Sequence, residues 1–359
     1  MGNNDNNRRR VTRYNENIGP DFSSGMVVLT IFLAAVVLLC VYFVCNADIG
    51  DTPETEQSDT ASTGDTDKIP GGDISGTDST PEDTAGPSEY TVSVSDSELH
   101  RGFLILVNGE YDYVFGDEKI VFLYGSEKKS SAYGLATVNI SCAESVLPYF
   151  NSMLEDYVAA SGDDGMVINS GHRTYDDQDQ ILQARIERVG EEEALAYVAL
   201  PGKSEHHTGY ALDIASHGEN NNPDWLPDNC RKYGFIQRYQ RSKEEITGIA
   251  YEYWHYRYVG EPHAEIMSAS DLCMEEYITM LSEFSYTRPL EYKTEDGDEY
   301  MIYYAACEND GETDITGPAG YEYTISGNNV DGFIVTVTLS LGEDGGTDSD
   351  TGADSGANT

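Results

Sequence analysis

The chain has 359 residues and a formal net charge of −43 at pH 7. A protein this acidic is not expected to bind nucleic acid, because phosphate recognition needs clustered lysine and arginine side chains. The composition is too uneven along the sequence for a single globule, so each segment has to be interpreted separately. We expect the acidic residues of the Thr-, Ser- and Gly-rich flanks to keep those segments solvated.

An apolar run near the N-terminus predicts one membrane span. From Met26 to Cys45 the sequence carries no charged residue, and this run has about the length that a helix needs to cross a bilayer. Arginines precede the run and acidic residues follow it, so the positive-inside rule places the N-terminus in the cytoplasm. A cleaved signal peptide would have a shorter apolar region, closer to the start. We expect residues 1–25 to be cytoplasmic, residues 26–46 to be a single-pass anchor in the cell membrane, and the rest to lie outside the cell.

Two segments have the composition of disordered chain. Residues 47–94 are rich in Thr, Ser, Gly, Pro and acidic residues, and they contain few large apolar side chains. Such a segment cannot bury enough apolar surface to offset the entropy that it would lose on ordering. We expect it to be a flexible acidic linker, and residues 343–359 to be a disordered tail of the same kind.

The first folded elements are expected from about Ser95 onwards. Residues 99–115 combine an apolar run with an Asn-Gly turn signal, which predicts a first strand or hairpin. Apolar residues at helical spacing then predict an amphipathic helix that follows Ser141 as its cap and ends at Ser161.

Further strands and a second helix follow in irregular order. The patterns predict a buried strand at 166–169, a helix at 177–200, and strands at YALDIA and WHYRYV. Because this order lacks regular β-α-β pacing, we expect an α+β domain over residues 95–285, with a small antiparallel sheet and flanking helices. Two later β-rich runs predict a small accessory region at residues 286–342.

Six cysteines are present, and no pair has CxxC spacing. An even number outside the membrane permits disulfides, and free buried thiols are the alternative. Two of them lie in the apolar run, and the others are Cys142, Cys230, Cys273 and Cys307.

Two short motifs contain residue types that bind a metal. SEHHTGYALDI spans residues 204–214, and YEYWHYRYVG spans residues 251–260. Two imidazoles and a carboxylate of this kind make a three-ligand site for Zn²⁺ and leave a fourth position for water. Neutral imidazole suits zinc, and a single carboxylate leaves a net positive site that can polarise a carbonyl group.

The paired motifs resemble the signature of the VanY-type D-alanyl-D-alanine carboxypeptidases. The matching positions are Ser204, His206, Gly209, Ala211, Asp213, Glu252 and His255. Relatives of that family include VanX dipeptidases and L,D-carboxypeptidases, and Hedgehog signalling domains have a related fold. The resemblance covers about residues 99–281. It implies that His206, Asp213 and His255 bind zinc and that Glu252 is the general base.

A third motif, SGHRTYDDQ, covers residues 170–178 and resembles the segment in which the family's arginine holds the terminal carboxylate of the substrate. The resemblance assigns this role to Arg173, whose guanidinium can form two parallel hydrogen bonds with a carboxylate. His172 stands where the family usually has tyrosine. By the same resemblance, Ser204 and Gln178 would contact the substrate backbone.

Three residues close to the motif positions are not expected to bind the metal or the substrate. His207 is disfavoured as a ligand by the Ser-x-His register, Glu205 is expected to be exposed to solvent, and Arg257 is expected to form a structural salt bridge. Strict strand alternation would place Glu252 and His255 on opposite faces. The backbone between them must therefore turn or bulge if both reach one metal.

The function expected from these motifs is zinc-dependent removal of the C-terminal D-alanine from peptidoglycan stem peptides, in cell-wall maturation. The motifs do not separate D,D activity on pentapeptide stems from L,D activity on tetrapeptide stems. Arg173 argues against an endopeptidase, because an internal bond offers no carboxylate to hold. Glu252 argues against the remaining alternative, a catalytically silent wall-binding module that keeps zinc for stability.

Overall fold

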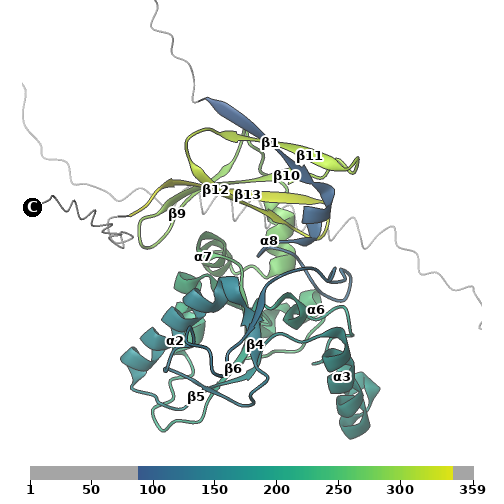
Figure 1. The fold of residues 1–359 in the computed structure, drawn as a ribbon, viewed down its shortest axis with the longest axis vertical. Helices are drawn as coiled ribbons and strands as arrows, with labels where there is room; N and C mark the ends of the chain where they lie inside the picture. Colours follow the sequence, from purple (N-terminus) through teal and green to yellow (C-terminus); the bar gives the residue numbers. More distant parts are fainter. Residues whose placement is uncertain (1–87, 343–359) are drawn as a thin grey trace, which may run out of the picture. The chain divides into compact units, whose positions relative to one another are not determined.

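The computed structural model describes residues 88–342, which all belong to one compact unit of the chain (Figure 1). The expected cytoplasmic segment 1–25, the anchor 26–46, most of the linker and the tail 343–359 lie outside the described residues. Within residues 88–342, none of the helices has the length and apolar character that a membrane crossing requires.

The first described strand lies within the segment expected to be linker. β1 (Glu89–Ser95) pairs along its whole length with β11 (Glu312–Pro318), in antiparallel register. Its side chains alternate between exposed and half-buried, with Tyr90, Val92 and Val94 on the half-buried side. The expectation of disorder up to residue 94 is therefore wrong for these residues, because this alternation suits a strand with one covered face.

A five-stranded sheet lies at the centre of the part that carries the motifs. Its order is β3-β5-β6-β8-β7, and its strands are antiparallel except for the edge pair β3 and β5, which is parallel. The strands predicted near residues 166, 211 and 255 are all observed. The bounds are β3 (Gly134–Leu135), β5 (Met166–Ser170), β6 (Ala211–Ser216), β7 (Phe235–Gln237) and β8 (His255–Tyr258).

Helix α2 (Leu147–Ser161) packs its apolar side against this sheet. Phe150, Leu154 and other buried side chains of α2 share one hydrophobic cluster with residues of β5, β6 and β8. The predicted end is observed, since Gly162 adopts a φ of +71° and terminates the helix. The predicted cap is wrong: Ser141 lies in strand β4 (Ser141–Ala143), whose residues are all buried and which pairs with β2 (Ile120–Phe122).

The helix expected at residues 177–200 is two shorter helices. α3 (Tyr175–Val189) starts with a capping box formed by Thr174 and Asp177, and α4 (Glu191–Leu195) follows it. Gly190 separates them with a φ of +91°, a conformation that a helix cannot continue through. The cap fixes the start of α3 directly after Arg173.

Residues 99–115 do not form the predicted strand or hairpin. After the 3₁₀ turn η1 (Asp96–His100), the segment is irregular although Leu104 to Val107 are all buried. Its backbone groups are satisfied by distant partners instead of a neighbouring strand: the Leu106 amide donates to Asn328, and Arg257 donates to the carbonyl groups of Phe103 and Ile105.

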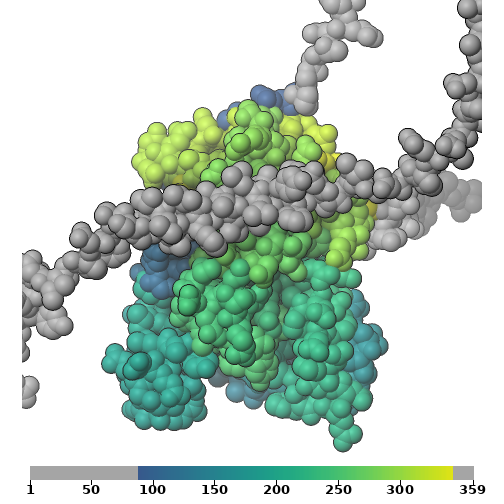
Figure 2. Space-filling view, turned by 180° about the vertical axis from the view of Figure 1, so that it is seen from behind, coloured from purple at the N-terminus to yellow at the C-terminus, as the bar shows by residue number. Residues whose placement is uncertain are grey.

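The C-terminal part is β-rich, as the sequence predicts. A four-stranded sheet has the order β12-β13-β10-β9. Its hydrophobic side chains share a second cluster with helices α7 (Glu261–Ala269) and α8 (Met274–Leu281) and with the irregular segment around Leu104, so the two parts lie against each other (Figure 2). The bounds are β9 (Leu290–Lys293), β10 (Glu299–Ala306), β12 (Glu322–Gly327) and β13 (Gly332–Ser340).

The remaining elements are short, apart from α7 and α8. The α-helices are α5 (Trp225–Asn229), α6 (Glu244–Thr247), α7 (Glu261–Ala269) and α8 (Met274–Leu281). The 3₁₀ turns are η1 (Asp96–His100), η2 (Glu144–Val146), η3 (Glu205–Thr208), η4 (Cys230–Tyr233) and η5 (Arg241–Lys243).

The four cysteines of the described part are free thiols, and all are buried. Burial raises the pKa of Cys142, Cys230 and Cys273 to about 12. These thiols are therefore protonated and unreactive at neutral pH.

Candidate metal centre and active site

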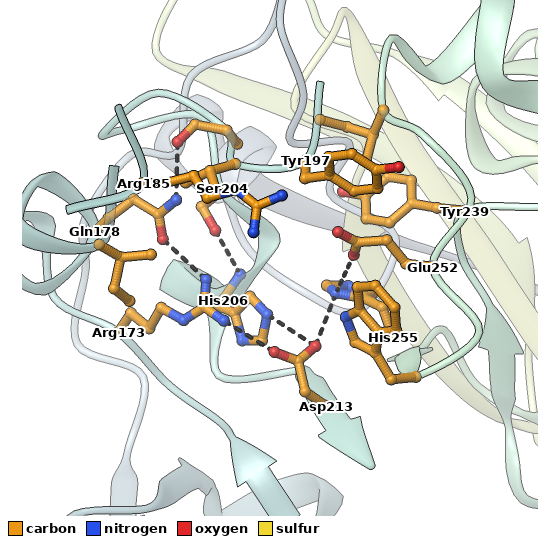
Figure 3. Close-up of a pocket in the computed structure, with 15 residues that line it drawn as sticks. Arg173, Gln178, Arg185, Tyr197, Ser204, His206, Asp213, Tyr239, Glu252 and His255 are labelled. Carbon is orange, nitrogen blue, oxygen red and sulfur yellow. Dashed lines mark hydrogen bonds and ion pairs between the residues drawn. The ribbon is translucent and has the colours of Figure 1, made fainter. Parts of the chain in front are cut away.

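The two metal-binding motifs meet where β6 and β8 pair. His206 lies in η3, immediately before β6, while Asp213 in β6 is the direct cross-strand partner of His255 in β8. His206 Nε2 lies 3.4 Å from Asp213 Oδ1, and His255 Nδ1 lies 3.3 Å from the same oxygen. All three residues are buried, and their donor atoms lie within 4.8 Å of one another (Figure 3).

The outer nitrogen of each histidine has a partner that can only accept a hydrogen bond. His206 Nδ1 lies 2.7 Å from the carbonyl oxygen of Gly171, and His255 Nε2 lies 3.3 Å from a carboxylate oxygen of Glu205. In the neutral rings, the outer nitrogens therefore carry the protons, and the inner nitrogens direct lone pairs at the space between the ligands. Burial also lowers the pKa of His206 to about 4, which keeps this imidazole neutral.

The ligand set fits a zinc ion. Asp213 Oδ1 is buried and accepts no hydrogen bond, whereas its other carboxylate oxygen is held by Arg173. A buried carboxylate oxygen without a donor is costly unless a cation neutralises it. Two imidazoles and one carboxylate are ligands that zinc prefers, and they leave one position open. Although burial opposes its charge, hydrogen bonds with Asp213 and Glu205 raise the pKa of His255 to about 9, so a bound zinc ion would displace a proton from this ring.

Glu205 is buried, contrary to the expectation that it faces solvent, and only 1% of it is exposed. Its Oε1 accepts a 2.8 Å hydrogen bond from Arg238 Nε and lies 3.1 Å from Arg257 Nη1, while Oε2 faces His255. Although burial opposes ionisation, the two guanidinium groups hold the pKa of Glu205 below its usual range. Arg238 is itself paired with Glu275. Glu205 therefore orients a ligand, a role for which its position beside His206 was the only signal in the sequence.

Glu252 reaches the ligands because the chain turns before β8. The turn at Tyr253 and Trp254 brings the His255 amide to 3.4 Å from the Glu252 carbonyl oxygen, and the Glu252 amide donates to Tyr239. One Glu252 carboxylate oxygen lies 3.6 Å from His255 Nδ1. This is the turn that a shared metal site requires. Burial raises the pKa of Glu252 to about 7, so this carboxylate can accept a proton near neutral pH.

Arg173 is held in the pocket wall by three hydrogen bonds. Its Nε donates to Ser170, its Nη1 to Gln178 and its Nη2 to Asp213, at distances of 2.9, 3.1 and 2.9 Å. A guanidinium has five N–H groups, so each terminal nitrogen keeps one more to donate. The buried Gln178 also donates to the carbonyl group of Ala199, and it therefore acts as a support for Arg173.

Ser204 and His207 lie on opposite sides of His206 in the sequence and differ in their contacts. Ser204 Oγ accepts a hydrogen bond from the His206 amide and keeps its own hydroxyl proton to donate into the pocket. His207 accepts from the Gly202 amide through Nε2, and its Nδ1 lies 2.8 Å from the carbonyl oxygen of Arg173. Both ring nitrogens of His207 are thus engaged away from the three ligands.

A pocket of about 430 Å³ opens above the ligands, and it includes Glu252, Arg173 and Ser204. Its walls also contain Trp254. Other wall residues lie outside the three motifs, and nothing in the sequence indicated them: Arg185, Tyr197 and Tyr239.

Comparison with known proteins identifies the family. A family model described as VanY, D-alanyl-D-alanine carboxypeptidase, matches residues 140–261. A D-alanyl-D-alanine carboxypeptidase of Enterococcus faecium is 37% identical over 265 residues, which cover 71% of this chain and 82% of that protein. The chain belongs to the VanY family. A second relative, the D-alanyl-D-alanine carboxypeptidase of Enterococcus faecalis, is 32% identical over 181 residues, which cover 45% of this chain and 68% of the relative.

The VanY fold is also seen in a solved structure. The vancomycin resistance D,D-dipeptidase VanXYg, in complex with a D-Ala-D-Ala phosphinate analogue, superposes with a TM-score of 0.61 and 31% identity, covering 70% of this chain and 99% of that one. The predicted α+β class and family are therefore confirmed. As a VanY-family protein, this chain is a zinc-dependent metallo-carboxypeptidase.

Proposed function

We propose that this chain removes the C-terminal D-alanine from pentapeptide stems of peptidoglycan, as a D-alanyl-D-alanine carboxypeptidase. One observation carries the proposal: Glu252 and Arg173 flank the same three buried donor groups on opposite sides of one pocket (Figure 3). A base and a carboxylate-binding group beside one metal site are what exopeptidase chemistry needs.

The reaction assigns a separate task to each of these side chains. His206, Asp213 and His255 would hold zinc, which when bound polarises the scissile carbonyl group and lowers the pKa of a water molecule toward 7. Glu252 accepts the proton of the attacking water and then passes it to the nitrogen of the departing D-alanine. The products are the shortened stem and free D-alanine.

The substrate is oriented by the wall that contains Arg173. Its two remaining terminal N–H groups match the two oxygens of the C-terminal carboxylate, which fixes the end of the peptide one residue from the cut bond. The Ser204 hydroxyl can donate to a backbone carbonyl group of the substrate. Gln178 contributes through its hydrogen bond to Arg173.

The decisive experiment uses purified residues 88–342 loaded with zinc. Pentapeptide and tetrapeptide muropeptides are incubated separately, and free D-alanine is measured. We expect release from the pentapeptide. Release from the tetrapeptide alone would make the protein an L,D-carboxypeptidase, and a zinc-loaded protein that releases nothing from either stem would support the wall-binding alternative.

We also propose that residues 26–46 anchor the enzyme in the cell membrane, with the peptidase outside. The uncharged run and the arginines that precede it support this orientation. In cell fractionation, the full-length protein should sediment with membranes, and protease added to intact spheroplasts should degrade its peptidase part. Recovery in the soluble cytoplasmic fraction would contradict the anchor.

A further inference from the structure

Arg185 lies in the substrate pocket but belongs to none of the three family motifs. It projects from α3, and Figure 3 shows its guanidinium directed into the pocket, between Ser204 and Tyr197. The pocket therefore contains a second guanidinium besides that of Arg173.

Among residues 88–342, the Arg185 side chain has an unpaired donor and no counter-ion. Its Nε is buried and has no hydrogen-bond partner, and no carboxylate forms an ion pair with the guanidinium group. Its guanidinium carbon lies 5.4 Å from the centroid of the Tyr197 ring, a cation-π contact that holds the group in place without occupying its N–H donors. A buried donor left unpaired is unfavourable, and an acceptor on a bound ligand would remove that cost.

Helical geometry separates Arg185 from the group that holds Arg173. Gln178, Ile181 and Arg185 all line the pocket, and their spacing places them on one face of α3. Arg185 lies seven positions after Gln178, which puts its backbone about 10 Å further along the helix axis. The face of α3 is thus a pocket wall with the Arg173 support at one end and a free guanidinium at the other.

We propose that Arg185 binds a carboxylate group of the substrate and is a second anion-binding residue of the pocket. The proposal rests on the function proposed above and extends it to substrate selection. A guanidinium matches a carboxylate with paired hydrogen bonds, and the pocket already excludes part of the solvent that would weaken them. That carboxylate is either the C-terminal one or a second free carboxylate on a residue that precedes the two D-alanines.

Two peptides distinguish these sources. The first is a D-Ala-D-Ala peptide with a doubly acetylated lysine before the alanines, so its only carboxylate is terminal. The second has acetylated diaminopimelate in place of lysine, which adds one carboxylate at the side chain. Kinetics of D-alanine release are measured with the zinc-loaded full-length enzyme, Arg185→Gln, Arg185→Lys, and Arg188→Gln as the control, an exposed arginine of α3 that does not line the pocket.

For Arg185→Gln, we expect kcat/KM to fall about 10- to 100-fold, mainly through KM, as for the loss of a hydrogen bond to a charged group. A fall on both peptides assigns Arg185 to the terminal carboxylate, and a fall on the diaminopimelate peptide alone assigns it to the side-chain carboxylate. Arg185→Lys should lose less kcat/KM than Arg185→Gln, because lysine keeps the positive charge. Arg188→Gln should have wild-type kinetics. Wild-type kinetics of Arg185→Gln on both peptides would overturn the proposal.

A binding measurement keeps this test independent of the proposed activity. Calorimetric titration of both peptides into Glu252→Gln, with and without Arg185→Gln, measures affinity without turnover. Weaker binding in the double variant supports the carboxylate contact, and equal binding overturns it. Absence of D-alanine release by the wild type would refute the proposed function separately.

Discussion

Each histidine of the metal centre is oriented by one hydrogen bond on its outer side. The Gly171 carbonyl group orients His206, and the Glu205 carboxylate orients His255. A ligand that is already oriented loses less entropy on binding, and its donor atom is the better base when the other nitrogen gives its proton to an acceptor. Glu205 can stay charged in the interior because Arg238 and Arg257 contact it.

Replacement of Glu205 by glutamine should weaken zinc binding and destabilise the protein. We expect about 10- to 100-fold lower zinc affinity, because the outer partner of His255 is altered. The metal-free protein should lose about 3–5 kcal/mol of unfolding free energy, because the buried Arg257 loses its counter-charge and Arg238 keeps only Glu275. Zinc competition titration and urea unfolding measure the two effects. The exposed Glu187→Gln on α3 is the control, and an unchanged zinc dissociation constant would contradict the assigned role.

Replacement of Glu252 by glutamine should remove activity and leave the metal in place. General-base removal typically costs about 10²- to 10⁴-fold in rate, and Glu252 is not among the three buried donors. D-alanine release and zinc content of the purified variant are measured together. Loss of zinc along with activity would instead make Glu252 part of the metal site.

At the scale of elements, the turn from η3 into β6 positions two ligands at once. Gly209 ends η3 with a φ of +76°, and its carbonyl oxygen accepts a hydrogen bond from the Ala143 amide. A Cβ atom at this position would lie 2.7 Å from Ile120 Cδ1 and 2.9 Å from the Ala143 nitrogen. The glycine is thus required both by its backbone angle and by the approach of β4.

Gly209→Ala should therefore destabilise the protein more than the replacement of a glycine that has a positive φ but no close neighbour. Gly248 is the matched control, because it has a φ of +72° and nothing within 4 Å of the added Cβ. We expect a loss of about 1 kcal/mol for Gly248→Ala and about 2 kcal/mol more for Gly209→Ala. Urea unfolding of both variants measures the difference, and equal losses would exclude a role for the close contact.

The first residue of α7 should make stability depend on pH. Burial raises the pKa of Glu261 from 4.5 to about 7, and the charges of Asp298 and Glu265 add to this shift. Because the folded state binds this proton more tightly than the unfolded chain does, stability is lost as the pH rises from about 4.5 through 7. Glu261→Gln should raise the melting temperature at pH 8 and much less at pH 5. The exposed Glu291→Gln is the control. An equal gain in melting temperature at pH 5 and pH 8 would show that titration of Glu261 is not the cause.

At the scale of the whole described molecule, the C-terminal sheet and the helices α7 and α8 share one hydrophobic cluster. Ile302 of β10 and Ile334 of β13 lie in it with Met274 and Leu281 of α8. Leu104 and Leu106 of the irregular segment belong to the same cluster. The C-terminal strands therefore support the elements that flank the peptidase sheet.

Ile302→Ala should weaken this shared core. The side chain is 0% exposed, and removal of its buried methyl and methylene groups should cost about 2–4 kcal/mol of unfolding free energy. We expect tyrosine and tryptophan fluorescence and zinc release to report one unfolding transition, at a lower urea concentration than in the wild type. Two separate transitions would show that the C-terminal sheet unfolds independently.

The sequence by itself determined the family, the α+β class and the candidate ligands, because these depend on short motifs. His206 and Asp213 lie seven positions apart, and Glu252 and His255 three apart, so each pair belongs to one short motif that is recognisable without the rest of the fold. Strands β5, β6 and β8 were also predictable, since each is a short apolar run.

Only the tertiary structure decided which charged residues are buried and which polar ones face the pocket. Glu205 is buried because Arg238 and Arg257, far from it in the sequence, compensate its charge. Arg185 faces the pocket because α3 turns that side toward the ligands, and β1 forms because β11, some two hundred residues later, supplies its partner strand. The free energy of each arrangement comes from contacts between distant segments, and local sequence patterns carry no record of those contacts.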